Sequence, residues 1–431
     1  MMEFKYFCPQ LKQKSKKMRR ILSFVMMAAF ASTAMAQQTI HITVENPTNA
    51  PRTDQPVVID LTKYGQVQSA LIKTGDEEIP CQLDDMDQDD NFDELCFLAD
   101  LKAKEKKPYT VTLYAEGSPR QYPARVYAEL LVRNSKVKEK NKHNNFLESI
   151  TARGDCADPY HILHHHGVEF ESELNGIRIY FDKRQTLDLY GKFQKRLELQ
   201  ETQFYTTKEQ KAEGYGDDVL WVGNTFGLGA FRGWDGQQPT MIDPVRSRTQ
   251  RIISYGPLRT IVEVIDKGWK APLTSHHSPL TSQPSPLNMT IRYTQYAGHR
   301  DTDVDVYFNK DVSDYLFSTG IINVKDSQEF SDKKGLRACW GCDWPSSDHE
   351  NFKPETVGLG ICIPSQYIKS EEPANKDQYT FVIGTSDNHL NYKIIYCSDN
   401  ESFGYHSDKE WFDFLKNWKQ TDVEQPIKVN Y

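Results

Sequence analysis

The chain has 431 residues, with 52 Lys and Arg, 60 Asp and Glu, and a formal net charge of −8. This negative charge argues against general nucleic-acid binding, because such binding depends on basic side chains that neutralise phosphates. The length is enough for two or three domains with a buried core, and no segment after residue 36 is long and apolar enough for a membrane helix.

The first 36 residues have the pattern of a secretory signal peptide. Basic side chains lie within residues 16–20, residues 21–31 are apolar but too short to span a bilayer, and small residues lead up to Ala36. We therefore expect cleavage after Ala36, a location in the periplasm or outside the cell, and no membrane insertion after cleavage. The removed segment would carry seven of the basic and one of the acidic side chains, which leaves a net charge of −14.

Residues 37–130 are predicted to form an N-terminal β-sandwich. Short segments that alternate apolar and polar residues are separated by turns rich in Asn, Pro and Gly, and they run over residues 39–44, 56–61, 78–83, 95–101 and 109–114. The acidic loop at 84–93 lacks the glycine and the final glutamate of an EF-hand, so we interpret it as a solvated loop, with a bound cation as the lesser alternative. Residues 131–160 are polar and rich in lysine, which predicts an exposed connection.

Residues 161–431 are predicted to form a larger, mostly β domain with few helices. Alternating segments predict strands at 176–181, 186–190, 219–222, 251–255, 260–265, 288–297, 301–309, 359–363, 379–384 and 392–397. A helix is expected within 198–213, and Ser407 begins an amphipathic C-terminal helix that should pack on the sheet. The proline-rich segment 271–287 is interpreted as a low-complexity loop.

Most candidate site residues lie in the stretch 161–236. In the first predicted strand of this stretch, apolar residues alternate with Arg178 and Tyr180, and the next predicted strand presents Asp188 and Tyr190. Side by side, the two strands would form a polar face that binds a ligand. The alternative is a solvent-exposed sheet face with cross-strand ion pairs.

Aromatic and charged residues near glycine-rich turns extend this candidate site. Arg232, Trp234 and Asp235 share one tight turn, a combination that suits a sugar ring, and Trp221 offers a further stacking surface. The chain's 22 Tyr, 21 Phe and 7 Trp fit sugar binding as well, although core packing explains most aromatic residues. The glycine-rich segment 223–229 lacks the Gly-Lys-Ser/Thr of a phosphate loop, so no nucleotide site is predicted.

The most specific part of the sequence is HHHGVEFESE…IRIYFD…GYGDDVL…GAFRGWDG, which ends at Gly236. This pattern resembles a domain-of-unknown-function family of exported proteins, roughly as long as this chain, that is encoded in polysaccharide-utilisation gene clusters of glycan-degrading Gram-negative bacteria. The resemblance covers most of the chain after residue 36. By analogy, it implies a mutarotase-like supersandwich fold and substrates drawn from uronic-acid glycans such as pectin fragments.

The favoured hypothesis is an exported carbohydrate-active enzyme that breaks glycosidic bonds of oligosaccharides during polysaccharide degradation, by elimination or by hydrolysis. Elimination from a uronate needs a base, an acid and a cation for the carboxylate. The candidates for base and acid are His166 and Tyr190, and the cation candidates are Arg178 and Arg184. Hydrolysis needs two carboxylates that flank the bond, and the candidates are Glu169, Glu171, Asp182, Asp188, Asp217 and Asp218.

The residues assigned to the site follow from these mechanisms. The catalytic candidates are His166, Tyr190, Glu169, Glu171 and Asp188. The substrate-binding candidates are Arg178, Tyr180, Asp182, Arg184, Lys192, Trp221, Arg232, Trp234 and Asp235.

Four histidines within residues 161–166 raise a metal hypothesis. Their spacing, HxxHHH, lacks the His-Glu-x-x-His pattern of a zinc protease helix. A single histidine at a sugar site is therefore favoured over one or two histidines as ligands, and no residue is assigned as a metal ligand. The sequence requires no cofactor and is compatible with a divalent cation.

Two further hypotheses belong to other functional classes. A non-catalytic glycan-binding protein would use Trp221, Trp234 and Tyr190 as stacking surfaces, whereas a structural protein of the cell envelope would have no pocket. The concentration of titratable groups at 178–188 favours catalysis. The expected partner is an oligosaccharide, and the sequence leaves the oligomeric state open.

Overall fold

The computed structural model describes residues 37–132, 146–154, 159–202, 205–272 and 286–431. The expected signal peptide lies outside these residues, and so do most of the expected lysine-rich connection and most of the proline-rich loop. Within the described residues the α-helices are α2 (Lys208–Ala212) and α3 (Asp408–Trp418), and further helical turns of other types cover Thr62–Tyr64, His164–His166, Ser365–Tyr367 and Lys419–Val423. None of these helices is both long and apolar enough to cross a membrane.

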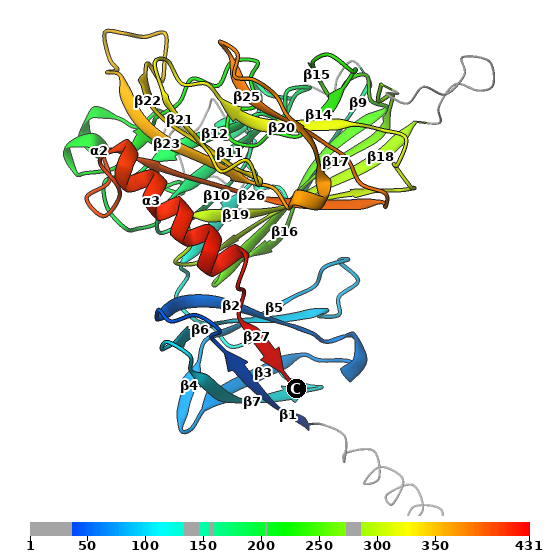
Figure 1. The fold of residues 1–431 in the computed structure, drawn as a ribbon. Helices are drawn as coiled ribbons and strands as arrows, with labels where there is room; N and C mark the ends of the chain where they lie inside the picture. Colours follow the sequence, from blue (N-terminus) through cyan, green and yellow to red (C-terminus); the bar gives the residue numbers. More distant parts are fainter. Residues whose placement is uncertain (1–36, 133–145, 155–158, 203–204, 273–285) are drawn as a thin grey trace, which may run out of the picture.

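Two antiparallel sheets form an N-terminal β-sandwich (Figure 1). The sheet β27-β1-β7-β3-β4 faces the sheet β2-β6-β5. Apolar side chains at alternate positions of the strands fill the space between them, including Ile42, Val57, Phe97 and Val111. The strand bounds are β1 Gln37–Glu45, β2 Arg52–Asp60, β3 Ser69–Thr74, β4 Glu77–Ile79, β5 Cys81–Asp84, β6 Glu94–Leu101, β7 Lys106–Tyr114 and β27 Lys428–Asn430.

The larger part of the chain is built on a nine-stranded antiparallel sheet. Its order is β21-β22-β23-β26-β19-β18-β17-β16-β9. The strand bounds are β9 Ser149–Arg153, β16 Ser247–Tyr255, β17 Arg259–Trp269, β18 Leu287–Tyr296, β19 Asp301–Phe308, β21 Gln328–Ser331, β22 Leu336–Asp343, β23 Glu355–Cys362 and β26 His389–Ser398.

Two five-stranded sheets cover this large sheet. One has the order β13-β12-β11-β10-β8, with bounds β8 Val126–Glu129, β10 Gly167–Ser172, β11 Gly176–Tyr180, β12 Leu187–Gly191 and β13 Asp217–Asp218. The other has the order β15-β14-β20-β25-β24, with bounds β14 Arg232–Trp234, β15 Pro239–Thr240, β20 Phe317–Ile322, β24 Ile368–Glu371 and β25 Gln378–Ile383.

One hydrophobic core joins the three sheets of the larger part. Strand β10 packs on β16, β17 and β18, and strand β20 packs on β23. The core between them includes Phe170, Ile177, Leu189, Val262 and Ile291. The fold-class prediction is therefore confirmed: the protein is mostly β, with an N-terminal β-sandwich, a larger supersandwich-like part and few helices.

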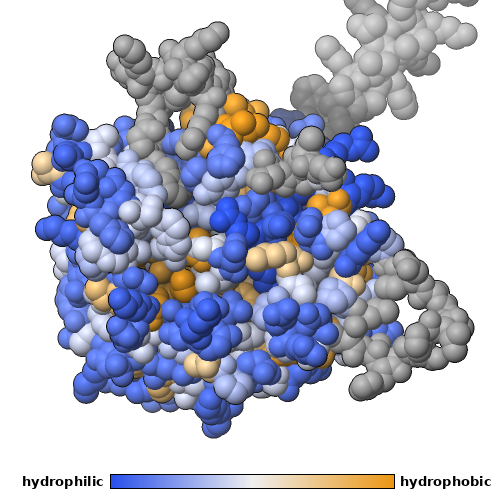
Figure 2. All heavy atoms as spheres, turned by 90° about the horizontal axis from the view of Figure 1, so that it is seen from above, coloured by the Kyte–Doolittle hydropathy of each residue, from blue (hydrophilic) through white to orange (hydrophobic). Residues whose placement is uncertain are grey.

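The outer face of the larger part, on the side away from the N-terminal sandwich, is mostly hydrophilic among the residues drawn in colour (Figure 2).

The strands β11 and β12 are buried along their whole length. The alternative of a solvent-exposed face for these two strands is therefore wrong, because neighbouring segments cover their polar side chains.

Strand pairing crosses the domain boundaries expected from the sequence (37–130, 131–160 and 161–431). The final strand β27 pairs with β1, so the C-terminal end of the chain returns to the N-terminal sandwich (Figure 1). Strands β8 and β9 pair instead with β10 and β16 of the larger part. A buried ion pair between Arg259 and Asp84, at 2.6 Å, ties the two parts together.

The C-terminal helix agrees with the prediction. It begins after Ser407, whose side chain accepts a hydrogen bond from the backbone N–H of Glu410. The helix side chains Trp411 and Leu415 are buried, and together with residues of β22 and β23 they form a separate hydrophobic core. The helix therefore covers the outer side of the nine-stranded sheet.

The helix expected within 198–213 and the strand expected over 219–222 are wrong in extent. Helix α2 covers only residues 208–212, after a capping box in which Thr207 and Gln210 bond reciprocally. Before α2, the backbone N–H of Thr202 donates to the backbone oxygen of Glu198 in a single turn, and the buried Glu198 carboxylate accepts the backbone N–H of Gly216. Near residue 219 the strand pairing with β12 covers only Asp217–Asp218, and beyond it Val219, Leu220 and Val222 are buried outside any strand.

Candidate active site

A pocket of about 150 Å³ lies beside the sheet that contains β11 and β12. The side chains that line it include Tyr160, His166, Tyr180, Arg184, Tyr205, Asp218 and Trp221. Four of them, His166, Tyr180, Arg184 and Trp221, belong to the site residues predicted from the sequence. Polar groups that converge in a concave space are the usual arrangement of a ligand site.

His166 and Tyr160 form one wall of the pocket. Their rings are stacked, with centroids 3.8 Å apart and planes inclined by 3°. His166 Nδ1 lies 3.0 Å from the backbone oxygen of Tyr160, and because a carbonyl only accepts, Nδ1 carries the proton of this contact. In the neutral imidazole, Nε2 is then the basic nitrogen.

Arg184 brings positive charge to the same pocket. Its guanidinium carbon lies 5.1 Å from the ring centroid of Tyr160 and 4.9 Å from that of Tyr180. Asp182 accepts hydrogen bonds from the backbone N–H and from Nε of Arg184, both at 2.7 Å. The predicted binding residues Asp182 and Arg184 therefore form one unit, in which the carboxylate orients the cation.

Behind the pocket, Arg178 joins two buried carboxyl groups. Strand pairing sets Arg178 opposite Asp188, and its Nη2 lies 3.4 Å from Asp188 Oδ2 and 3.2 Å from Asp218 Oδ1. The hydroxyl of Tyr180 donates to Asp188 Oδ2 at 2.9 Å. Tyr180 and Asp218 line the pocket, whereas Arg178 and Asp188 are buried behind them.

Burial favours the protonated forms of Tyr180 and Asp218. Burial and the charge of Asp188 raise the pKa of Tyr180 well above its ordinary value. Burial and the same charge also raise the pKa of Asp218, against the opposing effect of Arg178. The pKa of Asp188 is raised by burial too, although Arg178 lowers it in part. Since two carboxyl groups share one guanidinium, Asp218 can hold a proton at the pocket.

Replacing Asp218 by Asn is expected to stabilise the fold more as the pH rises. The folded-state pKa of Asp218 lies above its ordinary value of 3.8, so its stabilising contribution is complete below that value and is lost as the pH rises through the folded pKa. Asn cannot ionise and keeps an acceptor oxygen for Arg178. The measurement is the Tm of both proteins between about pH 4 and about pH 8. A pH-independent difference in Tm would contradict the raised pKa.

Three predicted site residues lie in a second buried network, away from the pocket. Lys192 Nζ donates to Glu171 Oε2 at 2.5 Å, and Glu171 accepts the backbone N–H of Glu198 at 2.9 Å. The hydroxyl of Tyr190 donates to Glu198 Oε2 at 2.9 Å. The structure therefore does not bring Glu171, Tyr190 or Lys192 to the candidate site, because their polar atoms connect the segment after β12 to β10.

The predicted sugar-binding turn also lies outside the pocket. Arg232 is buried and donates to Thr186 Oγ1 at 2.9 Å, and burial lowers its pKa to about 10. Trp234 is buried, and Asp235 accepts the backbone N–H of Gln237 in an exposed turn. These three side chains point into different surroundings and form no common binding surface in the described residues.

Sequence reasoning missed part of the pocket. Tyr160 and Tyr205 line it but come from the expected connection and from the segment expected to be helical, so no local pattern marked them. Asp218 was only one of six carboxylate candidates for hydrolysis. By contrast, Trp221 was expected to stack on a sugar, and its side chain is 52% exposed beside the pocket.

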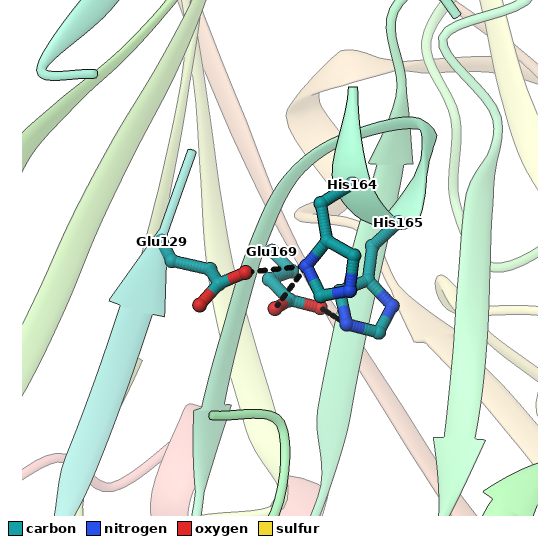
Figure 3. A group of neighbouring side chains, drawn as sticks. All are labelled: Glu129, His164, His165 and Glu169. Carbon is teal, nitrogen blue, oxygen red and sulfur yellow. Dashed lines mark hydrogen bonds and ion pairs between the residues drawn. The ribbon is translucent and has the colours of Figure 1, made fainter. Parts of the chain in front are cut away.

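Glu169 lies outside the pocket, in a buried cluster with Glu129, His164 and His165 (Figure 3). His164 Nδ1 is 2.5 Å from Glu129 Oε1, and His165 Nε2 is 3.0 Å from Glu169 Oε2. One ligand atom from each of the four residues lies within 4.8 Å of the others. The catalytic candidate Glu169 therefore lies in a group of metal-type donors and not at the pocket.

A larger cavity of about 290 Å³ lies between the N-terminal sandwich and the larger part. The arginines that line it form ion pairs with acidic side chains: Arg52 lies 2.9 Å from Asp422, and Arg300 lies 2.6 Å from Glu401. Matched charges are typical of a junction between two parts of a fold. The pocket at His166 is therefore the better candidate for chemistry.

Comparison with known proteins gives one family match and a weak structural likeness. A family model described as a domain of unknown function (DUF4861) matches residues 44–429. No curated protein matches the chain in sequence.

Two solved structures from Enterococcus faecalis are similar to the chain. A protein in glycosyl hydrolase family 38 has a TM-score of 0.45 and 8% identity, over 95% of this chain and 50% of its own. An α-mannosidase from strain V583 has a TM-score of 0.43 and 9% identity, over 96% of this chain and 49% of its own. The chain spans about half the length of these structures, and at such identities no site residue can be transferred from them.

Proposed function

This chain belongs to the family described as domain of unknown function DUF4861, and from the chemistry of its pocket we propose that it is an exported carbohydrate-active enzyme that cleaves uronic-acid-containing oligosaccharides by elimination. The observation that supports this is the convergence of His166, Tyr180 and Arg184 on one pocket. They provide a base, an acid and a cation. Export and a role in polysaccharide-utilisation clusters are parts of the same proposal.

Each group has a defined role in the proposed reaction. His166 Nε2 takes the proton from the carbon that bears the carboxylate, and the electron pair of that bond forms a double bond to the neighbouring carbon. The bond from that neighbour to the glycosidic oxygen breaks, and the leaving oxygen takes the proton of Tyr180. Arg184 binds the uronate carboxylate and stabilises the negative charge that develops on it.

The pocket supports elimination better than hydrolysis. Hydrolysis by two carboxylates needs both groups at the bond that breaks. Among the described residues that line the pocket, Asp218 is the one carboxyl group, and Asp188 lies behind Tyr180, to which it is hydrogen-bonded. A protonated Asp218 can serve as a further proton donor during elimination, or it can hydrogen-bond the substrate.

Binding without catalysis is the second candidate function. The exposed indole of Trp221 lies beside the pocket, where it can stack on a sugar ring that continues beyond the reacting residue. In a binding protein, the same pocket would hold an oligosaccharide with Arg184 on its carboxylate. The two functions differ in turnover, not in affinity.

The test is a panel of uronate-containing oligosaccharides incubated with the purified protein. Absorbance of the unsaturated uronate and release of reducing ends are followed together. We expect both signals to rise in parallel for at least one substrate. The matched control is the same oligosaccharide with its carboxyl groups reduced to alcohols, which should stay intact because its ring proton is no longer acidified. Reducing ends without unsaturation would refute elimination, and saturable binding without turnover would favour the second candidate.

A further inference from the structure

We infer that Glu129, His164, His165 and Glu169 form a binding site for one divalent transition-metal ion, for which zinc is the best fit. This site is separate from the pocket, and its role is structural. Its ligand atoms come from β8, from β10 and from the helical turn His164–His166 that directly precedes β10 (Figure 3). The metal-binding proposal does not depend on the proposed enzymatic function.

The strand pairing places the two carboxylates together. Glu129 is at the end of β8 and Glu169 is on β10, and they are direct partners in the antiparallel pair. Directly opposite residues project to the same side of a sheet. Two adjacent buried carboxylates repel one another unless cationic charge balances them, so this pairing calls for a counter-charge.

The turn before β10 brings two imidazoles to these carboxylates. His165 and His166 have φ values of 50° and 64°, in the left-handed region that residues other than glycine rarely adopt. The turn is held by hydrogen bonds from His164 N to Leu131 O at 2.7 Å and from Phe181 N to His166 O at 2.9 Å. As a result, the rings of His164 and His165 lie with centroids 3.7 Å apart, beside Glu169 (Figure 3).

The distances fit a metal ion after small movements. Zinc bonds to nitrogen and oxygen are about 2.0–2.1 Å long, so tetrahedral ligand atoms lie about 3.4 Å from one another. In the cluster His165 Nε2 is 3.0 Å from Glu169 Oε2, and all four ligand atoms lie within 4.8 Å. A shift of side chains within their rotamers would bring them to tetrahedral spacing.

The charges fit a divalent ion. Two carboxylates and two neutral imidazoles carry a charge of about −2 in all, which a divalent ion neutralises. Arg178 is the strand partner of Glu169 on β11 and places one positive charge beside the cluster, but its Nη2 lies 3.4 Å from Asp188 Oδ2 and 3.2 Å from Asp218 Oδ1. One guanidinium therefore faces four carboxyl groups, and the charge of the cluster is left largely unbalanced. The other carboxylate oxygen of Glu129, Oε2, accepts a hydrogen bond from the hydroxyl of Tyr127 at 2.6 Å, and such a contact orients a metal-binding carboxylate.

The donor types select the metal and its role. Calcium and magnesium prefer oxygen ligands alone, whereas a set of two imidazoles and two carboxylates suits zinc and its first-row neighbours. All four side chains are buried, and none of them lines the pocket. Such a closed site suits a structural ion. The bound ion would fix the strained turn that carries His166 to the pocket. This role of the ion in positioning His166 rests on the proposed function.

The first test measures metal content and affinity. The purified protein is stripped with a chelator and titrated with zinc in competition with a chromophoric chelator, and elemental analysis counts the ions. We expect one tightly bound zinc per chain and a Tm that rises with zinc concentration. Cobalt(II) should give the intense visible bands of a tetrahedral site. Failure of the wild-type protein to bind zinc or cobalt would overturn the proposal and leave the cluster as a network of His–Glu ion pairs.

Single substitutions locate the ion. His165→Ala and Glu129→Gln should each lose the bound zinc, and the wild-type titration keeps the proposal testable if either variant fails to fold. His161→Ala, in an exposed histidine of the same segment, is the matched control and should bind zinc normally. Asp87→Asn tests the exposed acidic group at Asp85, Asp87 and Asp89. Zinc lost through Asp87→Asn, or retained by both cluster variants, would overturn the assignment.

His166→Ala separates the two proposals. This variant should lose the elimination activity and keep the zinc, because His166 lies next to the cluster without belonging to it. Zinc binding without any elimination by the wild-type protein would support the metal site and refute the proposed function. Elimination without zinc binding would support the proposed function and refute the metal site.

Discussion

Tyr180→Phe is expected to lower kcat about 10²–10⁴-fold, the range typical of losing a general acid. The substitution removes the proton that the leaving oxygen needs and the hydrogen bond to Asp188, and it leaves the ring beside Arg184 in place. Because burial raises the pKa of Tyr180, its hydroxyl stays protonated at neutral pH and holds the proton that the leaving oxygen needs. The measurement is the initial rate of unsaturated product formation at saturating substrate.

Tyr190→Phe is the matched control for this experiment. Tyr190 lies one strand away on β12, is buried as well, and its hydroxyl donates a hydrogen bond to Glu198. Losing this hydroxyl should cost about 1–3 kcal/mol of stability, because Glu198 loses a buried partner, and it should leave kcat close to that of the wild type. Equal kcat values for the two variants would show that Tyr180 is not the acid.

Lys192→Met is expected to destabilise the fold by about 3–5 kcal/mol, the usual effect of removing one partner of a buried ion pair. Lys192 donates to Glu171 and to the backbone oxygens of Ser172 and Arg196, at 2.5 to 2.7 Å. Methionine keeps the aliphatic length but leaves the Glu171 carboxylate and two carbonyls without their cation. Urea unfolding, read as the free energy of unfolding of both proteins, is the measurement.

A double-mutant cycle and a surface control make this test specific. Lys192→Met combined with Glu171→Gln should lose less unfolding free energy than the two single variants lose in sum. The reason is that the double variant removes both charges and leaves no buried charge without a partner. Lys409→Met breaks an exposed pair with Asp413 on α3 and should leave the stability unchanged. Additive effects of Lys192→Met and Glu171→Gln would mean that the two side chains do not interact in the folded protein.

Local sequence patterns predicted much of the fold. Period-two alternation located most of the long strands, since each has one face in a core, and the paired strands β18 and β19 lie where strands were expected. The start of α3 was also predicted, because an N-cap serine satisfies backbone donors by a local contact. The helix within 198–213 was overpredicted because helix propensity does not record tertiary contacts, such as those of the buried Glu198 carboxylate with Tyr190 and Gly216.

For the candidate site, the sequence by itself determined which strands carry polar side chains, whereas the tertiary structure decided which of those side chains meet. Tyr180 and Tyr190 follow the same alternation, yet one reaches the pocket and the other binds Glu198. Likewise, Glu129 lies 40 residues before its strand partner Glu169 and carries no local signal. Alternation specifies the face of a strand, but the segments that cover that face come from elsewhere in the chain. Pockets and metal-type clusters depend on those long-range contacts, which no local pattern records.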